Sequence, residues 1–195
     1  MPKIVDHDAR RAELARAVWA VARREGIEHA SVRTVAAEAG CSAGSLRHYF
    51  PNQSDLLAFA LQVVVDRIRS RLAGIDRDRE PRRAARHVLH ELLPLDDERR
   101  AENEVWLAFT ARALVDPSLR EIQAEVDQAL RRTWIDIAQA LGVDRPRLEG
   151  ERLHALVDGL CVHAALNGDR LPAARIRAVI DHHLGTLAGR QPATS

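Results

Sequence analysis

"SVRTVAAEAGCSAGSLRHYFPNQSDLL", residues 31–57, is the stretch from which the fold of this chain can be predicted. Small and apolar residues recur at helical spacing after Ser31, which is placed to cap a helix, and Gly40 is placed to end it. A second segment, from Ala43 to Tyr49, is long enough for two helical turns. The stretch therefore predicts two short helices joined by a tight turn at residues 40–42.

The second of these helices has the side chains that contact with DNA requires. Small residues at its start would let the backbone come close to a duplex, and these include Gly44 and Ser45, just after Ser42. Donors for phosphates and base edges follow at Arg47, His48 and Tyr49. Leu46 and Phe50 are expected to point inward and hold the helix on the core. With the helix before residue 31, this is the pattern of a helix-turn-helix.

Two further groups of residues are expected near the phosphates. Arg33 and Thr34 lie at the start of the first short helix, where free backbone N–H groups favour an anion, and Gln53 lies at the start of the next long helix. A helix, a glycine and a short helix also occur in ordinary bundles. The residue pattern alone leaves both interpretations open, a DNA reader or a short amphipathic helix in a bundle.

The remainder of the 195 residues predicts more helix. Hydrophobic residues make up 46% and charged residues 29%, aromatic residues are scarce at 4%, and apolar residues recur at helical spacing between Pro, Gly and Asp breaks. We expect an all-α chain of about nine helices. The net charge is only +1, so any binding to DNA must come from local placement of cations.

Composition also bears on location. The two cysteines, Cys41 and Cys161, lie too far apart in a chain of this length to form a disulfide framework. The first residues are too charged for a signal peptide, and no run of 18 uncharged apolar residues occurs. These features predict a cytoplasmic protein with no membrane contact.

The 31–57 stretch resembles the DNA-binding domain of TetR-family transcriptional regulators. The resemblance covers roughly residues 8–60, and the positions that carry it are Ser31, Val35, Ala36, Ala39, Gly40, Ser42, Gly44, Leu46, Phe50 and Leu56. "VWLAFTARALVDPSLREIQ" and "LVDGLCVHAALNGDRL" are similar to the BetI-type branch of the family, as is "LRHYF". Two positions depart from the pattern: Arg47 stands where a Tyr is usual, and Gln53 where a Lys is frequent.

The resemblance implies a homodimer that binds a double-stranded, palindromic DNA operator and is released by a small-molecule effector. It implies an N-terminal three-helix reader at residues 1–51 and an effector-binding, dimerising helical bundle at residues 52–195. The helix after the reader, about Asn52 to Ala73, would couple the two parts. A repressor is expected, with no cofactor and no catalysis.

Two sets of residues are candidates for the functions of the second domain. Apolar walls with a few polar groups favour an effector cavity lined by Phe59, Val63, His87, His90, Trp106, Phe109, Trp134, Cys161 and His163. Broad apolar faces on the last two helices favour a dimer interface of Leu153, Leu156, Val157, Leu160, Ala164, Ile176, Val179, Ile180 and Leu184. Both sets also fit ordinary packing within one protomer. Glu104 and Asp158 lie near enough in sequence to balance a cationic effector.

Other chemistry finds little support in the sequence. His87 and His90 have the i, i+3 spacing of metal ligands, but no third ligand is fixed, and the adjacent His182 and His183 face different sides of a helix. Cys161 and His163 diverge at i, i+2 and are not expected to form a nucleophilic pair. A small all-α enzyme and a helical scaffold that no longer binds DNA remain as alternatives, and neither a paired acid and base nor a phosphate loop favours the enzyme.

Overall fold

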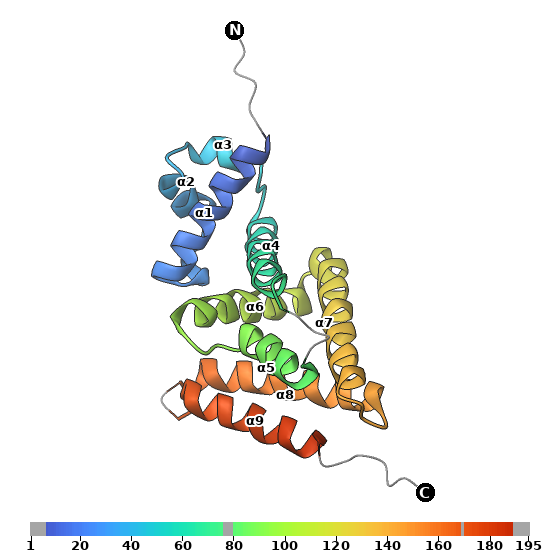
Figure 1. Ribbon diagram of the computed structural model, residues 1–195. Helices are drawn as coiled ribbons and strands as arrows, with labels where there is room; N and C mark the ends of the chain where they lie inside the picture. Colours follow the sequence, from blue (N-terminus) through green and yellow to red (C-terminus); the bar gives the residue numbers. More distant parts are fainter. Residues whose placement is uncertain (1–6, 76–79, 169, 189–195) are drawn as a thin grey trace, which may run out of the picture. The chain divides into compact units, whose positions relative to one another are not determined.

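A computed structural model describes residues 7–75, 80–168 and 170–188, and every regular element in these ranges is helical (Figure 1). The elements are α1 (His7–Glu25), η1 (Ile27–His29), α2 (Val32–Glu38), α3 (Ala43–Arg47), α4 (Gln53–Leu72), α5 (Pro81–Leu92), α6 (Asp97–Val115), η2 (Pro117–Leu119), α7 (Arg120–Ala140), α8 (Pro146–Leu166) and α9 (Ala173–Ala188), where η denotes a single 3₁₀ turn. The predicted all-α fold is confirmed, with nine α-helices in the described ranges. None of the described helices is long and apolar enough to cross a membrane.

Packing divides the chain into two compact units. Among the described residues, the first contains 7–67 and 104–120, and the second contains 68–75, 80–103, 121–168 and 170–188. Both α4 and α6 therefore contribute residues to each unit. The sequence-based boundary after residue 51 stays a prediction, and the packing groups the first part of α4 and the last part of α6 with the helix-turn-helix segment.

The first unit has a small apolar core under the helix-turn-helix. α1 packs on α2, and α2 packs on α3. Leu14, Val18 and Val21 of α1 are fully buried, as are Val35 of α2 and Leu46 of α3. Burial of these side chains fixes the short helices, which are too short to be stable alone in water.

The second unit is a helical bundle in which α5 packs on α9. Its core includes Leu89, Trp134, Leu153, Ile176 and Ile180, each at most 1% exposed. The Trp134 ring packs against the His154 imidazole at a tilt, with ring centroids 6.3 Å apart.

A half-buried ionic cluster joins three helices of this second unit. The Arg71 guanidinium of α4 donates to Glu91 of α5 at 2.6 Å, and it donates to both carboxylate oxygens of Glu102 of α6 at 2.8 and 2.6 Å. Arg99 also donates to Glu91 at 2.8 Å. Glu102 is almost fully buried, so losing Arg71 would leave its charge in a site where desolvation is costly.

Candidate nucleic-acid interface

The turn between α2 and α3 depends on one glycine. Gly40 has a φ of 62°, which side chains other than glycine adopt only with strain. It follows the last turn of α2, where the Cys41 N–H donates to the Ala36 carbonyl at 2.9 Å. At the other end of α2, Ser31 is the N-cap, as predicted, and forms a capping box with Thr34. The local sequence therefore sets both the start and the end of α2.

α3 starts as predicted but is shorter than predicted. Ser42 is its N-cap and accepts a hydrogen bond from the Ser45 N–H at 3.1 Å. The helix ends at Arg47 instead of Tyr49, with His48 as its C-cap. Pro51 explains the early end, because it has no N–H to continue the helix and it disfavours helical backbone at the residue before it.

The outer side of this helix is exposed, as a DNA reader requires. Exposed positions include Ser42, Gly44, Ser45, Arg47, His48 and Tyr49, whose side chain is 40% exposed although aromatic. The Arg47, His48 and Tyr49 side chains have no hydrogen bond or ion pair within the described part of the chain. Leu46 and Phe50 are buried on the inner side, as expected.

Gly44 has no structural reason to be glycine. A Cβ built there would meet only the Ser42 hydroxyl, at 3.9 Å, and its φ is not positive. Glycine inside a helix costs about 1 kcal/mol relative to alanine. The absence of a side chain therefore leaves open space on the exposed side of α3, where a partner could approach the backbone.

The three phosphate candidates differ in how their side chains are engaged. Arg33 is exposed at the start of α2. The Thr34 hydroxyl donates to the His29 carbonyl at 2.8 Å and accepts from the Ser31 N–H at 2.8 Å, so it is part of the helix cap. The Gln53 amide donates to the Ala30 carbonyl at 2.7 Å and so ties α4 to the segment just before the N-cap of α2. Gln53 holds the reader together in addition to any contact with DNA.

A polar cluster that the sequence analysis did not identify lies at the same end of α4. The Ser54 hydroxyl donates to Asp116 Oδ2 at 2.5 Å and accepts from Arg112 Nε at 3.2 Å. The pKa of Asp116 is lowered from 3.8 to about 2. The hydrogen bond from Ser54 is the largest cause, and the hydrogen bonds from Ser118 come next. Asp116 before Pro117 and Ser118 is a recognisable cap sequence, but nothing in it indicates contact with a serine 62 residues earlier.

Among the effector candidates in the first unit, Phe59 packs against the reader. The rings of Phe59 and Phe50 lie 4.9 Å apart, and the Arg11 guanidinium lies 5.1 Å above the Phe59 ring. Phe109 is fully buried, whereas Val63 and Trp106 are half-buried. Glu104 lies near Glu28. Burial raises the pKa of Glu104, and the like charge of Glu28 raises it further by a smaller amount.

The effector candidates in the second unit are scattered between its core and its surface. Trp134 and Cys161 are buried, His90 is half-buried, and His87 and His163 are exposed. The Trp134 indole N–H has no hydrogen-bond partner among the described residues. The His154 imidazole packs beside Trp134, and 3.6 Å separate His154 Nε2 from Asp158 Oδ2. Burial raises the pKa of Asp158.

The metal and nucleophile alternatives gain no support in the described ranges. These ranges hold no group of three or more His, Cys, Asp or Glu side chains arranged to bind a metal ion. Burial raises the pKa of the Cys161 thiol to about 12, so this thiol is protonated at neutral pH.

Most of the predicted dimer residues are already packed inside one protomer. Leu153, Val157, Leu160, Ile176, Ile180 and Leu184 are each at most 7% exposed, so they have almost no surface left for a second chain. Leu156, Ala164 and Val179 are half-buried. The hydrophobic spacing identified the inward faces of α8 and α9, because the widest apolar stripe of a helix is the one that faces its own core.

A second row of small and apolar residues, most of them exposed, lies on the opposite face of α8. It consists of Leu148, Ala155, Gly159, Val162 and Leu166, whose spacings of 7, 4, 3 and 4 residues place them in one row along the helix. Leu166 is 75% exposed, which is unusual for a large apolar side chain. We call this row the outer α8 face.

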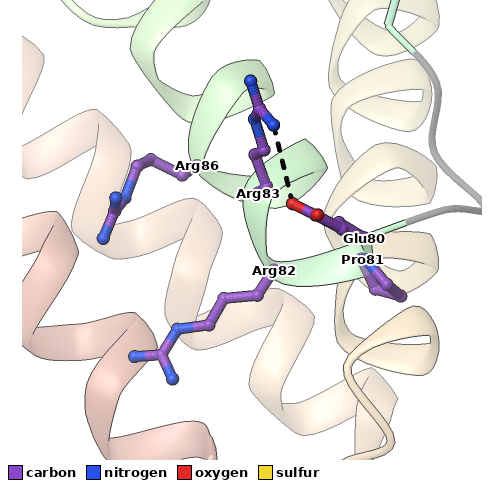
Figure 2. A pocket seen from close by; sticks show the side chains of 5 residues that line it. All are labelled: Glu80, Pro81, Arg82, Arg83 and Arg86. Carbon is purple, nitrogen blue, oxygen red and sulfur yellow. Dashed lines mark ion pairs between the residues drawn. The ribbon is translucent and has the colours of Figure 1, made fainter.

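An open hollow of about 560 Å³ lies at the start of α5 (Figure 2). Its lining consists of Glu80, Pro81, Arg82, Arg83 and Arg86. Arg83 pairs with Glu80 at 3.7 Å, and Arg86 pairs with Asp181 at 2.7 Å. The hollow contains none of the predicted effector residues, and its surplus of arginine does not suit a cation.

Two family models match this sequence. The model described as "Bacterial regulatory proteins, tetR family" matches residues 14–59, and the model described as "BetI-type transcriptional repressor, C-terminal" matches residues 81–189. The HTH-type transcriptional regulator PksA of Bacillus subtilis (strain 168) is 39% identical over 194 residues, which cover 96% of this chain and 94% of PksA.

Solved structures are similar over nearly the whole length. A transcriptional regulator from Rhodococcus sp. Rha1 is 34% identical with a TM-score of 0.81, and the match covers 92% of this chain and 96% of that one. The multidrug binding protein EbrR, complexed with ethidium, is 27% identical with a TM-score of 0.66, covering 89% and 98% of the two chains.

Proposed function

Because this chain belongs to the TetR family of transcriptional regulators, we propose that it represses transcription as a homodimer that binds a palindromic operator and leaves it when an effector binds. The family also makes it a ligand-responsive DNA-binding protein and not an enzyme. It acts where the DNA is, in the cytoplasm. The observation that carries the proposal is the exposed row of unengaged donors on and after α3.

In this proposal Arg47, His48 and Tyr49 contact the duplex, and Ser42, Gly44 and Ser45 allow the backbone of α3 to approach it. Arg33, Thr34 and Gln53 lie beside the phosphates. Two readers in one dimer would contact half-sites roughly 34–36 Å apart, one helical turn of the duplex. The effector must bind better to the released form than to the operator-bound form, because only such a difference can shift the equilibrium.

Selection of bound sequences from random duplex DNA tests the proposal. We expect enrichment of an inverted repeat, and a protein that enriches no sequence would contradict the proposal. With the selected duplex, Arg47→Ala should weaken binding by about 1–3 kcal/mol if Arg47 reads a base. Arg132→Ala, at an exposed position on α7, is the matched control and should leave the affinity unchanged.

For the dimer, we propose the outer α8 face as part of the interface in place of the buried residues. A second chain would cover its exposed leucines and valine and so remove their apolar surface from water. Small residues in the middle of the row, Ala155 and Gly159, would let two helices approach closely.

For the effector, we propose a small organic cation. EbrR was solved with ethidium, which is such a cation, and Asp158 near the Trp134–His154 pair would supply a negative charge beside aromatic rings. Fluorescence titration with ethidium should give weaker binding for Asp158→Asn than for the original chain. Asp136→Asn, at an exposed position on α7, serves as the control, and equal affinities for all three proteins would remove Asp158 from the site.

A further inference from the structure

We propose that Ser54, Arg112 and Asp116 form a positioning clamp for the DNA reader, so that specific operator binding depends on this cluster although none of the three is expected to contact DNA. We call it the Ser54 clamp. The proposal deepens the DNA-binding function above and rests on it. All three residues belong to the first compact unit.

The clamp is a closely bonded group. Ser54 is only 4% exposed, and its hydroxyl bridges the Asp116 carboxylate at 2.5 Å and the Arg112 Nε at 3.2 Å. Arg112 also pairs directly with Asp116, with 3.4 Å between Nη2 and Oδ2. The other Asp116 oxygen accepts from the backbone N–H and the hydroxyl of Ser118 at 3.0 and 2.7 Å. Both oxygens of the carboxylate are therefore engaged, which fixes its position.

Ser54 is not needed to start the helix that contains it. α4 already has a cap, because the Asp55 N–H donates to Asn52 Oδ1 at 2.9 Å. A buried hydroxyl at the second position of α4 therefore serves a contact beyond its own helix. That contact is with the end of α6 and the turn that follows it.

Gln53, the residue before Ser54, contacts the segment that precedes α2 in the reader. Gln53 donates to the Ala30 carbonyl, one residue before the N-cap of α2. Adjacent residues at the start of α4 thus hold α2 on one side and the end of α6 on the other. A displacement of the α6 end would be transmitted through Ser54 and Gln53 to the helix-turn-helix.

α4 and α6 meet through polar groups a second time. In the second unit, Arg71 of α4 holds Glu102 of α6. Each helix therefore has one polar anchor to the other in each unit. Within the first unit, the Ser54 clamp is a polar contact through which the end of α6 holds the start of α4, and Gln53 beside it holds the segment before α2.

The test compares specific with non-specific DNA binding. Ser54→Ala should weaken binding to the selected operator about tenfold, while affinity for a scrambled duplex of equal length stays within twofold. A loosened reader can still bring its cations to the phosphates of any DNA duplex, so non-specific affinity is kept. It spends less time with its base-contacting side chains aligned to the operator bases, so specific affinity falls. A general loss of folded protein would instead lower both affinities together, and that result would overturn the proposal.

Three further comparisons make the test decisive. Ser118→Ala removes one hydrogen bond to the same carboxylate, while the backbone N–H of residue 118 still donates to it and Ser54 is untouched, so operator affinity should stay within twofold. Arg112→Gln changes a side chain that is 52% exposed, so it should leave the fold intact, and it should weaken operator binding several-fold even if Ser54→Ala does not fold. In the Asp116→Ala background, Ser54→Ala should cost less than twofold more, since the partners act as a pair.

The results separate this proposal from the function on which it rests. If the original chain binds no duplex, the proposed function fails and the clamp fails with it. If the original chain binds its operator and folded Ser54→Ala or Arg112→Gln binds equally well, only the clamp is wrong.

Discussion

Polar side chains in the reader fall into two groups: some form hydrogen bonds within the fold, and others are exposed without such bonds. Thr34 and Gln53 are hydrogen-bonded to backbone carbonyls, and Ser42 caps α3. Arg47, His48 and Tyr49 are exposed after the fold has used its other donors. The sequence predicted the second group correctly as exposed, but it did not reveal the internal roles of the first, because a hydroxyl or amide serves a cap and a phosphate equally well.

Gly44→Ala should separate stability from DNA binding. The substitution adds a methyl group to open space within a helix, so the free energy of unfolding should rise by about 0.5–1 kcal/mol. The same methyl group would hold the α3 backbone away from a duplex, so operator affinity should fall. Urea denaturation and fluorescence anisotropy measure the two effects, and unchanged operator affinity would show that the backbone at Gly44 does not approach DNA.

The two cysteines should differ sharply in reactivity. Cys161 is buried with a pKa raised to about 12, whereas Cys41 is partly exposed in the turn of the reader. At pH 8 the native protein should react at one thiol per chain with iodoacetamide, and Cys41→Ser should remove that reaction. Mass spectrometry after short labelling provides the measurement, and equal labelling of both residues would contradict the described burial of Cys161.

Element by element, the sequence predicted the helices well and their interactions poorly. The cap at Ser31 and the stop at Gly40 were predicted, because caps and stops depend on neighbouring residues. α3 ended earlier than predicted, since its apolar pattern continues to Phe50 while Pro51 prevents the backbone from continuing. The link from Ser54 to Asp116 could not be predicted, because it joins segments whose proximity only the fold determines.

Close packing of α7 on α8 gives a test at the scale of helices. A Cβ at Gly150 would lie 2.9 Å from Ile135 Cγ1 and 3.0 and 3.1 Å from the backbone N and Cα of the same residue. Gly150→Ala should therefore lower the free energy of unfolding by about 1–3 kcal/mol, despite the better helix propensity of alanine.

The control for this prediction is the same change combined with Ile135→Ala. Two of the three close atoms are backbone, so trimming the Ile135 side chain should recover little of the loss. Urea denaturation at one fixed protein concentration gives the values. An increase in stability for Gly150→Ala alone would mean that the two helices can separate at little cost.

For the whole molecule, the predicted dimer interface stays a prediction. The strongest apolar stripes of α8 and α9 face their own core, and the weaker outer α8 face remains exposed. Effector-cavity residues were equally hard to choose, because core positions and cavity walls share the same apolar residue types. Family resemblance, in contrast, depends on many spaced residues together and identified the function.

Leu166→Asp should weaken self-association if the outer α8 face is the interface. Burying an aspartate among apolar side chains is costly, so we expect the dimer dissociation constant to rise at least tenfold in analytical ultracentrifugation. Leu114→Asp is the control, since Leu114 is 77% exposed on α6 and lies outside this face. Equal dissociation constants for the two variants would place the interface elsewhere.

The first compact unit is built from two separate segments of the chain, and this affects how the protein folds during synthesis. Residues 104–120 are part of this unit, so an emerging chain cannot complete it until residue 120 has left the ribosome, although the helix-turn-helix itself is finished by residue 50. Until then the buried side of α4 that α6 will cover is open to chaperones and proteases. A gene fragment that stops after the reader would keep that vulnerability permanently.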